Sequence, residues 1–275
     1  MRRANTQSSW ASARSSVVFH QRVIDRSTVV KEIEIHARNV RESVNYIKEK
    51  EKTLRQEGIT MLTLCGGIGT FALCYERAGG RIKAHIGCEI DPMARAIAKT
   101  HHNIDHVTLP QDLTQITATD IQELVARYGA IDVMAWSTPC QGLSRANREG
   151  QGMADSRSAL FERAVYVYKL LRAHNPQIKF IAENVDFRTK HPTDYAWACE
   201  QLGQAEYSDA KEMSAANRKR LFWHNLGEGD GEAHEPIDAN TLLGPGARLK
   251  HGAKTAPCLM ASWRCTRGGC SRRCT

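Results

Sequence analysis

The feature that most constrains the fold is an alternation of short apolar runs with longer helical stretches between residues 59 and 182. Roughly four to eight apolar residues bounded by glycine or polar residues are typical of buried strands, whereas longer stretches with 3.6-residue periodicity are typical of helices. Strands that alternate with helices in this way pair into a parallel sheet covered by helices. The sequence therefore predicts an α/β chain with a doubly wound, mostly parallel sheet.

The individual elements follow from apolar periodicity and from glycine and proline positions. The predicted strands are 59–64, 81–88, 107–109, 131–136 and 178–182. The predicted helices are 28–57, a stretch ending at Arg77, 92–101, 118–128 and 158–174. We expect Thr119 and Gln122 to form a capping box at the start of helix 118–128. Alternation in 218–223 predicts a further strand with Arg218 and Arg220 on one face.

The loops after the strands are where a ligand is expected, because open parallel sheets bind ligands beyond the carboxyl ends of their strands. These loops comprise Cys65–Phe71, Glu89–Asp91, Gln111–Leu113, Ser137–Gln141 and Glu183–Val185. Glycines after the first strand let backbone approach a ligand closely. Glu89 can accept hydrogen bonds from ribose hydroxyls, and Asp112 can bind an adenine amino group or the amino-acid part of a cofactor. The competing interpretation is that Asp91 is a helix cap and Asp112 a turn residue.

Cys140 is the candidate nucleophile, because a cysteine in a polar loop facing a cofactor can be an activated thiolate. An inert buried thiol is the alternative. Glu183 offers a carboxyl group on the adjacent strand end, with a cap as the alternative. Arg218 and Arg220 offer cations, with a solvated edge strand as the alternative. The nine cysteines show no paired spacing, so we expect reduced thiols. The spacing of Cys258, Cys265, Cys270 and Cys274 lacks a CxxC pair, so we expect no metal.

Charge is concentrated at the two ends of the chain, whose net charge is +8. Residues 1–58 hold 12 Lys and Arg against 7 Asp and Glu, and residues 239–275 hold 7 Lys and Arg and no acid. Basic ends on a mildly acidic body suit a polyanion such as DNA. Basic tails that only aid solubility are the alternative. No apolar run approaches the roughly 20 residues of a membrane-spanning helix, so we expect no membrane partner.

Taken in order, the strand-end motifs resemble those of the carbon-5 cytosine DNA methyltransferases, from about Met61 to Leu226. The matching segments are LTLCGGIGTFALCYERAGG (62–80), IGCEIDPMARAIAKTHHN (86–103), QDLTQI (111–116), DVMAWSTPCQGLSRANREG (132–150), FIAENV (180–185) and SAANRKRLFW (214–223). Within that family, DAKEMSAANRKRLFWHNL (209–226) is most similar to the animal de novo enzymes and their bacterial and phage relatives. Thr63, Cys65 and Thr70 depart from the pattern, standing where the family usually has an acid, an aromatic residue and a glycine.

The resemblance implies a Rossmann-like fold that uses S-adenosylmethionine to methylate a cytosine flipped out of double-stranded DNA. Cys140 would attack carbon 6, Glu183 would hold N3, Arg220 would bind O2, and Arg218 would support that site. The cofactor-binding residues it implies are Cys65, Gly66, Gly67, Ile68, Gly69, Thr70, Phe71, Glu89, Ile90, Asp112, Leu113 and Pro139. The DNA-binding residues it implies are Gln141, Ser144, Arg145 and Asn184.

The expected organisation is a disordered basic arm (1–27), an N-terminal helix (28–58), a catalytic domain (59–226) and a short, basic recognition region or tail (227–275). A truncated or frameshifted end and a genuine basic arm are the two interpretations of that tail. The family's late motifs are not found in that tail. A catalytically impaired DNA-binding or regulatory relative therefore stays open as an alternative, and so does a transfer RNA cytosine methyltransferase, because it shares the catalytic core. We expect a cytoplasmic, nucleoid-associated protein of a bacterial or phage-infected cell, and the sequence leaves its oligomeric state open.

Overall fold

The computed structural model describes residues 57–145, 147–227, 237–243, 249 and 253–257, and six residues between 38 and 48. The chain divides into two compact units, Met1–Glu51 and Lys52–Thr275. In the first unit the described residues are helical, which agrees with the predicted helix 28–57; they are Arg38, Arg41, Glu42, Val44, Asn45 and Lys48. The predicted arm 1–27, most of the tail after residue 227 and its four cysteines lie outside the described residues.

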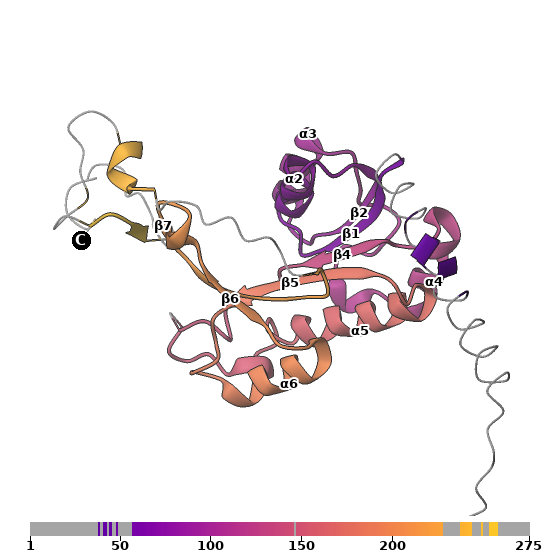
Figure 1. Cartoon of the computed structure of the whole chain (residues 1–275). Helices are drawn as coiled ribbons and strands as arrows, with labels where there is room; N and C mark the ends of the chain where they lie inside the picture. Colours follow the sequence, from indigo (N-terminus) through magenta and orange to yellow (C-terminus); the bar gives the residue numbers. More distant parts are fainter. Residues whose placement is uncertain are drawn as a thin grey trace, which may run out of the picture. The chain divides into compact units, whose positions relative to one another are not determined.

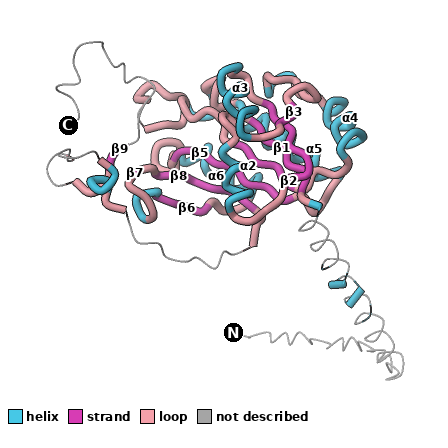
Figure 2. Tube along the Cα trace, turned by 90° about the horizontal axis from the view of Figure 1, so that it is seen from above, coloured by secondary structure: helices cyan, strands magenta, loops and turns pink. Residues whose placement is uncertain are grey.

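The second unit is built on a large sheet (Figure 2). The sheet has seven strands in the order β3-β2-β1-β4-β5-β8-β6. Strands β3 to β5 run parallel, and β8 is antiparallel to both of its neighbours, β5 and β6. The strands are β1 (Ile59–Leu64), β2 (Ile82–Cys88), β3 (Ile104–Asp105), β4 (Val133–Trp136), β5 (Lys179–Val185), β6 (Glu206–Asp209) and β8 (Lys219–His224). β7 (Ala216–Asn217) and β9 (Ala256–Pro257) form a separate parallel pair. The predicted doubly wound, mostly parallel sheet is confirmed.

Helices lie on both faces of the sheet (Figure 1). The α-helices are α2 (Thr70–Arg77), α3 (Pro92–His101), α4 (Ala118–Tyr128), α5 (Leu160–His174) and α6 (Pro192–Leu202). The short 3-10 turns are η1 (Leu113–Gln115), η2 (Gly152–Ala154), η3 (Ala210–Glu212) and η4 (Ala239–Leu242). A large apolar core joins the sheet to α4, α5 and α6, and a smaller cluster joins β1 to α2.

Aromatic side chains fix the middle of the sheet. Trp223 of β8 lies edge-on to Phe161 of α5, with ring centroids 5.4 Å apart, and Trp136 of β4 stacks on Phe180 of β5 at 5.6 Å. Trp136, Phe161 and Trp223 are fully buried. Burial of such large rings dominates core energetics. These contacts therefore hold β4, β5 and β8 in the register that places their ends side by side.

Three predicted details are wrong. Residues 107–109 are not a strand: the Asp105 carboxylate accepts the N–H groups of Val107 and Thr108, which diverts them from a sheet ladder, and Val107 is 85% exposed. The parallel pairing lies earlier, at β3. The capping box of α4 uses Thr117 and Asp120 instead of Thr119 and Gln122, because Thr117 has the extended backbone that an N-cap requires. β5 runs on to Val185, since β8 pairs with its second half.

The sheet order has a switch point between β1 and β4, which lie side by side although they are far apart in sequence. From there the chain winds outward to β2 and β3 on one side and to β5 on the other. The crevice outside the carboxyl ends of the strands at such a point is where open α/β sheets bind ligands. The loops after β1 and β4 border it, and they contain Cys65–Gly69 and Ser137–Cys140.

Candidate active site

The loop after β1 is a tight glycine turn. Cys65 has a φ of 51° and its N–H donates to the carbonyl of Cys88 at the end of β2 (2.7 Å). Gly67 has a φ of 56° and open space beside its Cα, whereas a Cβ on Gly69 would lie 2.8 Å from the ring of His102. The turn therefore requires glycine for backbone conformation at Gly67 and for close packing at Gly69.

Glu89 connects this loop to the loop after β2. One of its carboxylate oxygens accepts the N–H of Gly67 (2.8 Å) and the other accepts the N–H of Asp91 (3.0 Å). An ionised carboxylate offers about four acceptor positions, so both oxygens retain capacity for a ligand's hydroxyls. Ile90 and Ile68, which flank this pair of loops, are 67% and 52% exposed. The arrangement presents a fixed acid beside open apolar surface.

Gln111 contacts Glu89, although the sequence analysis does not place it among the expected cofactor-binding residues. Its side-chain amide donates to the carbonyls of His106 and Leu109, and its oxygen accepts the N–H of Glu89 (3.3 Å). It therefore ties the loop after β3 to Glu89. The sequence signal that could have identified Gln111 is its position beside Asp112, just after a predicted strand.

Asp112 behaves as a turn residue in this structure. Hydrogen bonds from the hydroxyl and N–H of Thr114 lower the pKa of the Asp112 carboxyl. Its side chain is half-exposed at the same strand-end edge, while Leu113 points into the core and is 3% exposed. A ligand contact by Leu113 would therefore go through its backbone.

Cys65, in the loop after β1, and Cys88, at the end of β2, are unsuited to nucleophilic chemistry. Burial, reinforced by the charges of Glu89 and Asp112, raises the pKa of Cys65 to about 12. Burial first, and then Cys65, Glu89 and Asp112, raise the pKa of Cys88 to about 12. Because the thiolate is the nucleophile, these thiols stay neutral at physiological pH. The candidate thiol is therefore the one after β4.

Cys140 lies in the loop after β4 and is half-buried with a free thiol. The loop leaves the strand at Ser137, whose N–H donates to the carbonyl of Leu64 (3.4 Å). The carbonyl of Cys140 accepts the N–H groups of Leu143 (3.0 Å) and Ser144 (2.7 Å). The cysteine therefore begins a hydrogen-bonded turn at the switch point.

Glu183 on β5 is held from two sides. The hydroxyl of Ser137 donates to Oε2, and Arg220 Nε of β8 lies 2.5 Å from Oε1. Arg218 Nη2 approaches the same oxygen to 4.0 Å. Both arginines therefore reach one carboxylate, as the predicted strand alternation implies. The buried carboxylate of Asp209 accepts the N–H of Arg218 (3.0 Å) and so fixes the start of this strand.

Asn184 does not have the position expected of a DNA contact. It is 1% exposed, and its amide donates to the carbonyl and the hydroxyl of Thr138 (both 3.3 Å). The prediction of DNA contact conflicts with this burial. The physical reason is that β5 runs through Asn184, so its side chain lies on the opposite face of the sheet from that of Glu183, which contacts Ser137. Asn184 instead ties β5 to the loop that carries Cys140.

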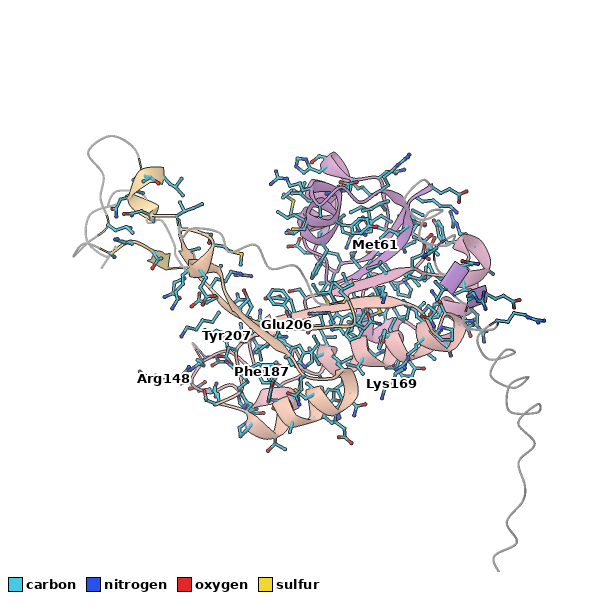
Figure 3. The ribbon with its side chains drawn as sticks, in the orientation of Figure 1. Met61, Arg148, Lys169, Phe187, Glu206 and Tyr207 are labelled. Carbon is cyan, nitrogen blue, oxygen red and sulfur yellow. The ribbon has the colours of Figure 1, made fainter. Side chains whose placement is uncertain are left out.

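The other predicted site residues lie around these loops with different exposure. The exposed ones are Thr70, Gln141 and Arg145; the half-buried ones are Gly66, Phe71, Pro139 and Ser144. Arg145 is close enough to Asp186 to help lower the pKa of that carboxyl, after the larger effect of Arg188. Figure 3 shows Arg148, on the same loop as Arg145, projecting outward from the molecule. This loop therefore presents cations to solvent beside Cys140.

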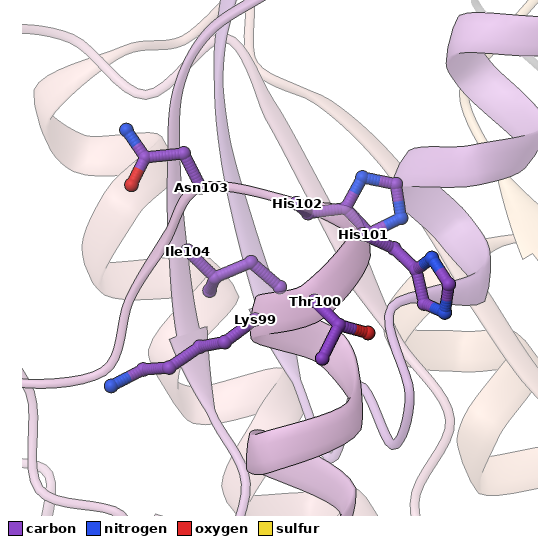
Figure 4. A pocket seen from close by; sticks show the side chains of 6 residues that line it. All are labelled: Lys99, Thr100, His101, His102, Asn103 and Ile104. Atoms are coloured by element: carbon purple, nitrogen blue, oxygen red, sulfur yellow. The ribbon is translucent and has the colours of Figure 1, made fainter.

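An open hollow of about 540 Å³ lies at the end of α3 (Figure 4). It is lined by Lys99, Thr100, His101, His102, Asn103 and Ile104. Of these, His102 packs against Gly69 and also pairs with Glu76 at 3.4 Å. Because this histidine is engaged beneath the glycine turn, we interpret the hollow as the outer side of the loop after β1.

Comparison with known proteins agrees with this geometry. The model of the C-5 cytosine-specific DNA methylase family matches residues 59–222. The chain belongs to this family. The match includes β1 to β6 and most of β8, and it contains Cys140, Glu183 and Arg220. The resemblance predicted from the motifs is thereby confirmed.

Three individual relatives give the extent of the similarity. The chain is 33% identical over 128 residues to the type II methyltransferase M1.HphI of Haemophilus parahaemolyticus, covering 46% of this chain and 32% of that protein. It is 26% identical over 136 residues to the DNA (cytosine-5)-methyltransferase DRM2 of Oryza sativa subsp. japonica, covering 48% and 23%. A solved Escherichia coli prophage protein described as a DNA modification methyltransferase matches with a TM-score of 0.47 and 20% identity, covering 66% and 53%. The chain thus spans about a third or less of the two curated relatives.

Two further properties concern the described residues alone. None of their helices is both long and apolar enough to cross a membrane. Within the same part of the chain, no group of three or more His, Cys, Asp and Glu side chains is placed to hold a metal ion.

Proposed function

We propose that this chain is a DNA (cytosine-5-)-methyltransferase that uses S-adenosylmethionine and double-stranded DNA. The observation that carries the proposal is the placement of Glu183, whose carboxylate is held between Arg220 and Ser137, the first residue of the loop that carries Cys140. A free thiol, a fixed acid and a guanidinium are thereby placed at the carboxyl edge of one sheet. This set suits addition to an electron-poor ring whose charge must be stabilised.

The residues at the switch point fit S-adenosylmethionine. Glu89 would accept the ribose hydroxyls with its remaining lone pairs, and the open space beside Gly67 would admit the ligand against the backbone. Exposed Ile90 and Ile68 would cover an adenine ring and the adjacent chain. A neutral Cys65 replaces an aromatic side chain in this pocket and leaves fewer contacts to the base. When bound, the cofactor supplies the methyl group that carbon 5 accepts.

Cys140 is the proposed nucleophile. Its thiolate would form a bond from sulfur to carbon 6 of cytosine, which makes carbon 5 enamine-like and nucleophilic. After carbon 5 has gained the methyl group it loses its proton, and the electrons of that C–H bond re-form the ring double bond and expel the Cys140 thiolate. The thiolate is regenerated, so the residue acts as a covalent catalyst.

Glu183 and Arg220 would stabilise the ring as charge develops on it. Glu183 would hold a proton at N3, and Arg220 would donate to O2 while keeping Glu183 in place. The 2.5 Å contact between them fixes the acid before substrate arrives, so that little reorganisation is needed during the reaction. Arg218, at 4.0 Å, supports the pair more weakly.

Double-stranded DNA is the proposed partner. Carbon 6 is inaccessible inside a duplex, so the cytosine must be flipped into the pocket. Exposed Arg145 and Arg148, on the loop after Cys140, and Gln141 beside it would contact the backbone and the vacated position. Contacts to phosphate are sequence-independent and become weaker as salt rises. A cytoplasmic, nucleoid-associated location would follow from this substrate.

One labelling experiment tests the proposal. The protein is incubated with S-adenosylmethionine labelled in its methyl group and with either duplex DNA or transfer RNA, using wild type, Cys140→Ala and the control Cys74→Ala. Cys74 is also a free cysteine, but it is exposed on α2. We expect label in DNA with wild type and Cys74→Ala and none with Cys140→Ala. Label in transfer RNA alone, or cofactor binding without any transfer, would overturn the proposal and favour one of the two alternatives.

The covalent step has its own measurement. DNA that carries 5-fluorocytosine has no proton to lose at carbon 5, so the adduct with Cys140 should accumulate after methyl transfer. A protein–DNA species that survives denaturation and maps to the Cys140 peptide is the expected result. An adduct on another cysteine would contradict the assignment.

A further inference from the structure

The loop that follows Cys140 is folded back on itself. The side-chain amide of Asn147 donates to the carbonyl of Gln141 (2.9 Å), and the N–H of Gly152 donates to the carbonyl of Gly142 (3.1 Å). A Cβ on Gly150 would lie 2.4 Å from that same Gly142 carbonyl. The segment therefore has a compact closed form, which its own glycines make possible.

Lys190, from the segment after β5, holds this closed form from outside. Its ammonium donates to the carbonyl of Ser144 (3.0 Å) and to that of Asn147 (2.5 Å). A Cβ on Gly150 would come within 3.0 Å of Lys190 Nζ, so the ammonium lies directly against the loop. Hydrogen bonds from a charged donor are roughly twice as strong as neutral ones. Two of the three ammonium protons are thus used to fasten the loop.

The base of Lys190 is itself anchored. Its N–H donates to the carbonyl of Phe187 (3.1 Å), and the Phe187 ring is fully buried, with its centroid 6.0 Å from that of Trp223. Figure 3 shows Phe187 near the centre of this part of the molecule. The lysine therefore connects the loop to the buried core.

A second contact from the same segment holds the far end of the loop. Asp194 at the start of α6 accepts the N–H of Met153 with Oδ2 (2.9 Å). A Cβ on Gly152 would lie 2.1 Å from that oxygen, so the backbone approaches as closely as glycine allows. The loop is thus fixed at residues 144 and 147 by Lys190 and at residue 153 by Asp194.

The contact between Lys190 and Ser144 is directly linked to Cys140. The carbonyl of Cys140 accepts the N–H of Ser144, and Lys190 binds the carbonyl of that same Ser144. One residue therefore links the ammonium to the turn that begins at the nucleophile. Loss of the ammonium would remove one of the contacts that hold Ser144 and so would loosen the turn.

We propose that Lys190 is a positioning residue for Cys140: it holds the Ser144–Asn147 part of the loop and so sets the orientation of the thiol. The kinetic part of this inference rests on the proposed function, whereas the holding of the loop does not. Lys190 acts through backbone carbonyls. An arginine at this position keeps the positive charge and the N–H donors but presents them in a planar guanidinium, so Lys190→Arg should retain part of the function.

The test compares Lys190→Met, Lys190→Arg and the matched control Lys169→Met. Lys169 is an exposed lysine on α5 whose ammonium bonds the side chain of Gln201. Hydrogen exchange is followed by mass spectrometry over residues 141–152, and the alkylation rate of Cys140 by iodoacetamide is followed on its own peptide. Neither measurement requires methyl transfer. Circular dichroism verifies that each variant is folded.

We expect amides of residues 141–152 in Lys190→Met to exchange about tenfold faster or more, because two charge-assisted hydrogen bonds are lost. Alkylation of Cys140 should rise severalfold as the turn loosens. Methyl transfer to duplex DNA should show kcat lowered by about tenfold or more through misplacement of the nucleophile, with an unchanged Kd for S-adenosylmethionine. Lys190→Arg should fall between wild type and Lys190→Met, and Lys169→Met should match wild type.

Unchanged exchange and alkylation in Lys190→Met would overturn the inference, as would the same changes in Lys169→Met. A fall in DNA affinity at unchanged kcat would also overturn it, because Lys190 would then be a phosphate contact. If wild type transfers no methyl group while Lys190→Met still loosens the loop, the proposed function fails and the loop-holding role is supported.

Discussion

Arg220 Nε lies 2.5 Å from Glu183 Oε1, whereas Arg218 Nη2 lies 4.0 Å from the same oxygen. The Arg220 side chain is 18% exposed and that of Arg218 is 49% exposed. Ion pairs in water are screened and contribute little, while a closer and less hydrated pair contributes more. The two arginines, which look equivalent in the sequence, are therefore unequal in the structure.

Replacing these arginines singly should separate their contributions. We expect Arg220→Ala to lower the single-turnover rate of methyl transfer by about 100-fold or more, because it removes a fixed donor at the charge that develops. Arg218→Ala should lower it by no more than about fivefold. Cofactor affinity, measured in parallel, should not change in either variant. A larger loss in Arg218→Ala than in Arg220→Ala would contradict the geometry.

Glu89 should determine cofactor affinity. We expect Glu89→Ala to weaken binding of S-adenosylmethionine by about 100-fold, because it removes the ribose acceptor and frees the N–H groups of Gly67 and Asp91. Isothermal titration calorimetry without DNA measures this directly. Glu123→Ala, at an exposed position on α4, is the matched control and should bind like wild type. Equal affinity in both variants would remove Glu89 from the site.

Gly142 should be required for the closed loop after Cys140. A Cβ there would lie 2.4 Å from the Ser158 hydroxyl and 2.7 Å from the carbonyl of Gly152, distances that real Cβ atoms do not show. We expect Gly142→Ala to displace the loop and lower kcat by about 100-fold at unchanged cofactor affinity. Gly227→Ala, where no atom of the described residues lies within 4 Å of the added Cβ, should be neutral. Full activity in Gly142→Ala would show that the loop tolerates displacement.

The elements that the sequence predicted best are those whose burial pattern is local. β1 and helices α3 and α4 have the predicted bounds, because apolar periodicity and a proline or glycine at an end decide them. Residues 107–109 were wrong for an equally local reason. The hydrogen bonds that Asp105 accepts outweighed the β-propensity of Val107, and propensity alone does not show that competition.

The candidate site also has features that the sequence predicts and features that it does not. Topology brings the strand ends together, so Cys65–Gly69, Glu89 and Cys140 could be placed from sequence. The contacts that orient them could not. Ser137 and Glu183 are 46 residues apart, as are Ser144 and Lys190, and each pair meets only because β4 lies beside β5 in a fixed register. The burial of the Asn184 side chain depends on the same register.

A buried histidine near the cofactor loop should make stability depend on pH. His85 of β2 is 4% exposed and its Nε2 lies 2.9 Å from the hydroxyl of Thr63. Burial, reinforced by the positive potentials of His102 and His106, lowers the pKa of His85 to about 4. In the unfolded chain the pKa of histidine is about 6.5. Between these values the unfolded chain binds a proton that the folded chain does not, so stability falls as pH falls from about 6.5 to about 4.

Urea unfolding at pH 7 and at pH 4 measures this effect in wild type, His85→Gln and the control His174→Gln, whose histidine is exposed at the end of α5. Glutamine keeps a polar partner for Thr63 but does not titrate. We expect wild type and His174→Gln to lose about 3 kcal/mol more stability between the two pH values than His85→Gln does. The comparison uses the change with pH, because His85→Gln also alters packing at pH 7. Equal losses in all three proteins would mean that His85 titrates alike in the folded and unfolded chain.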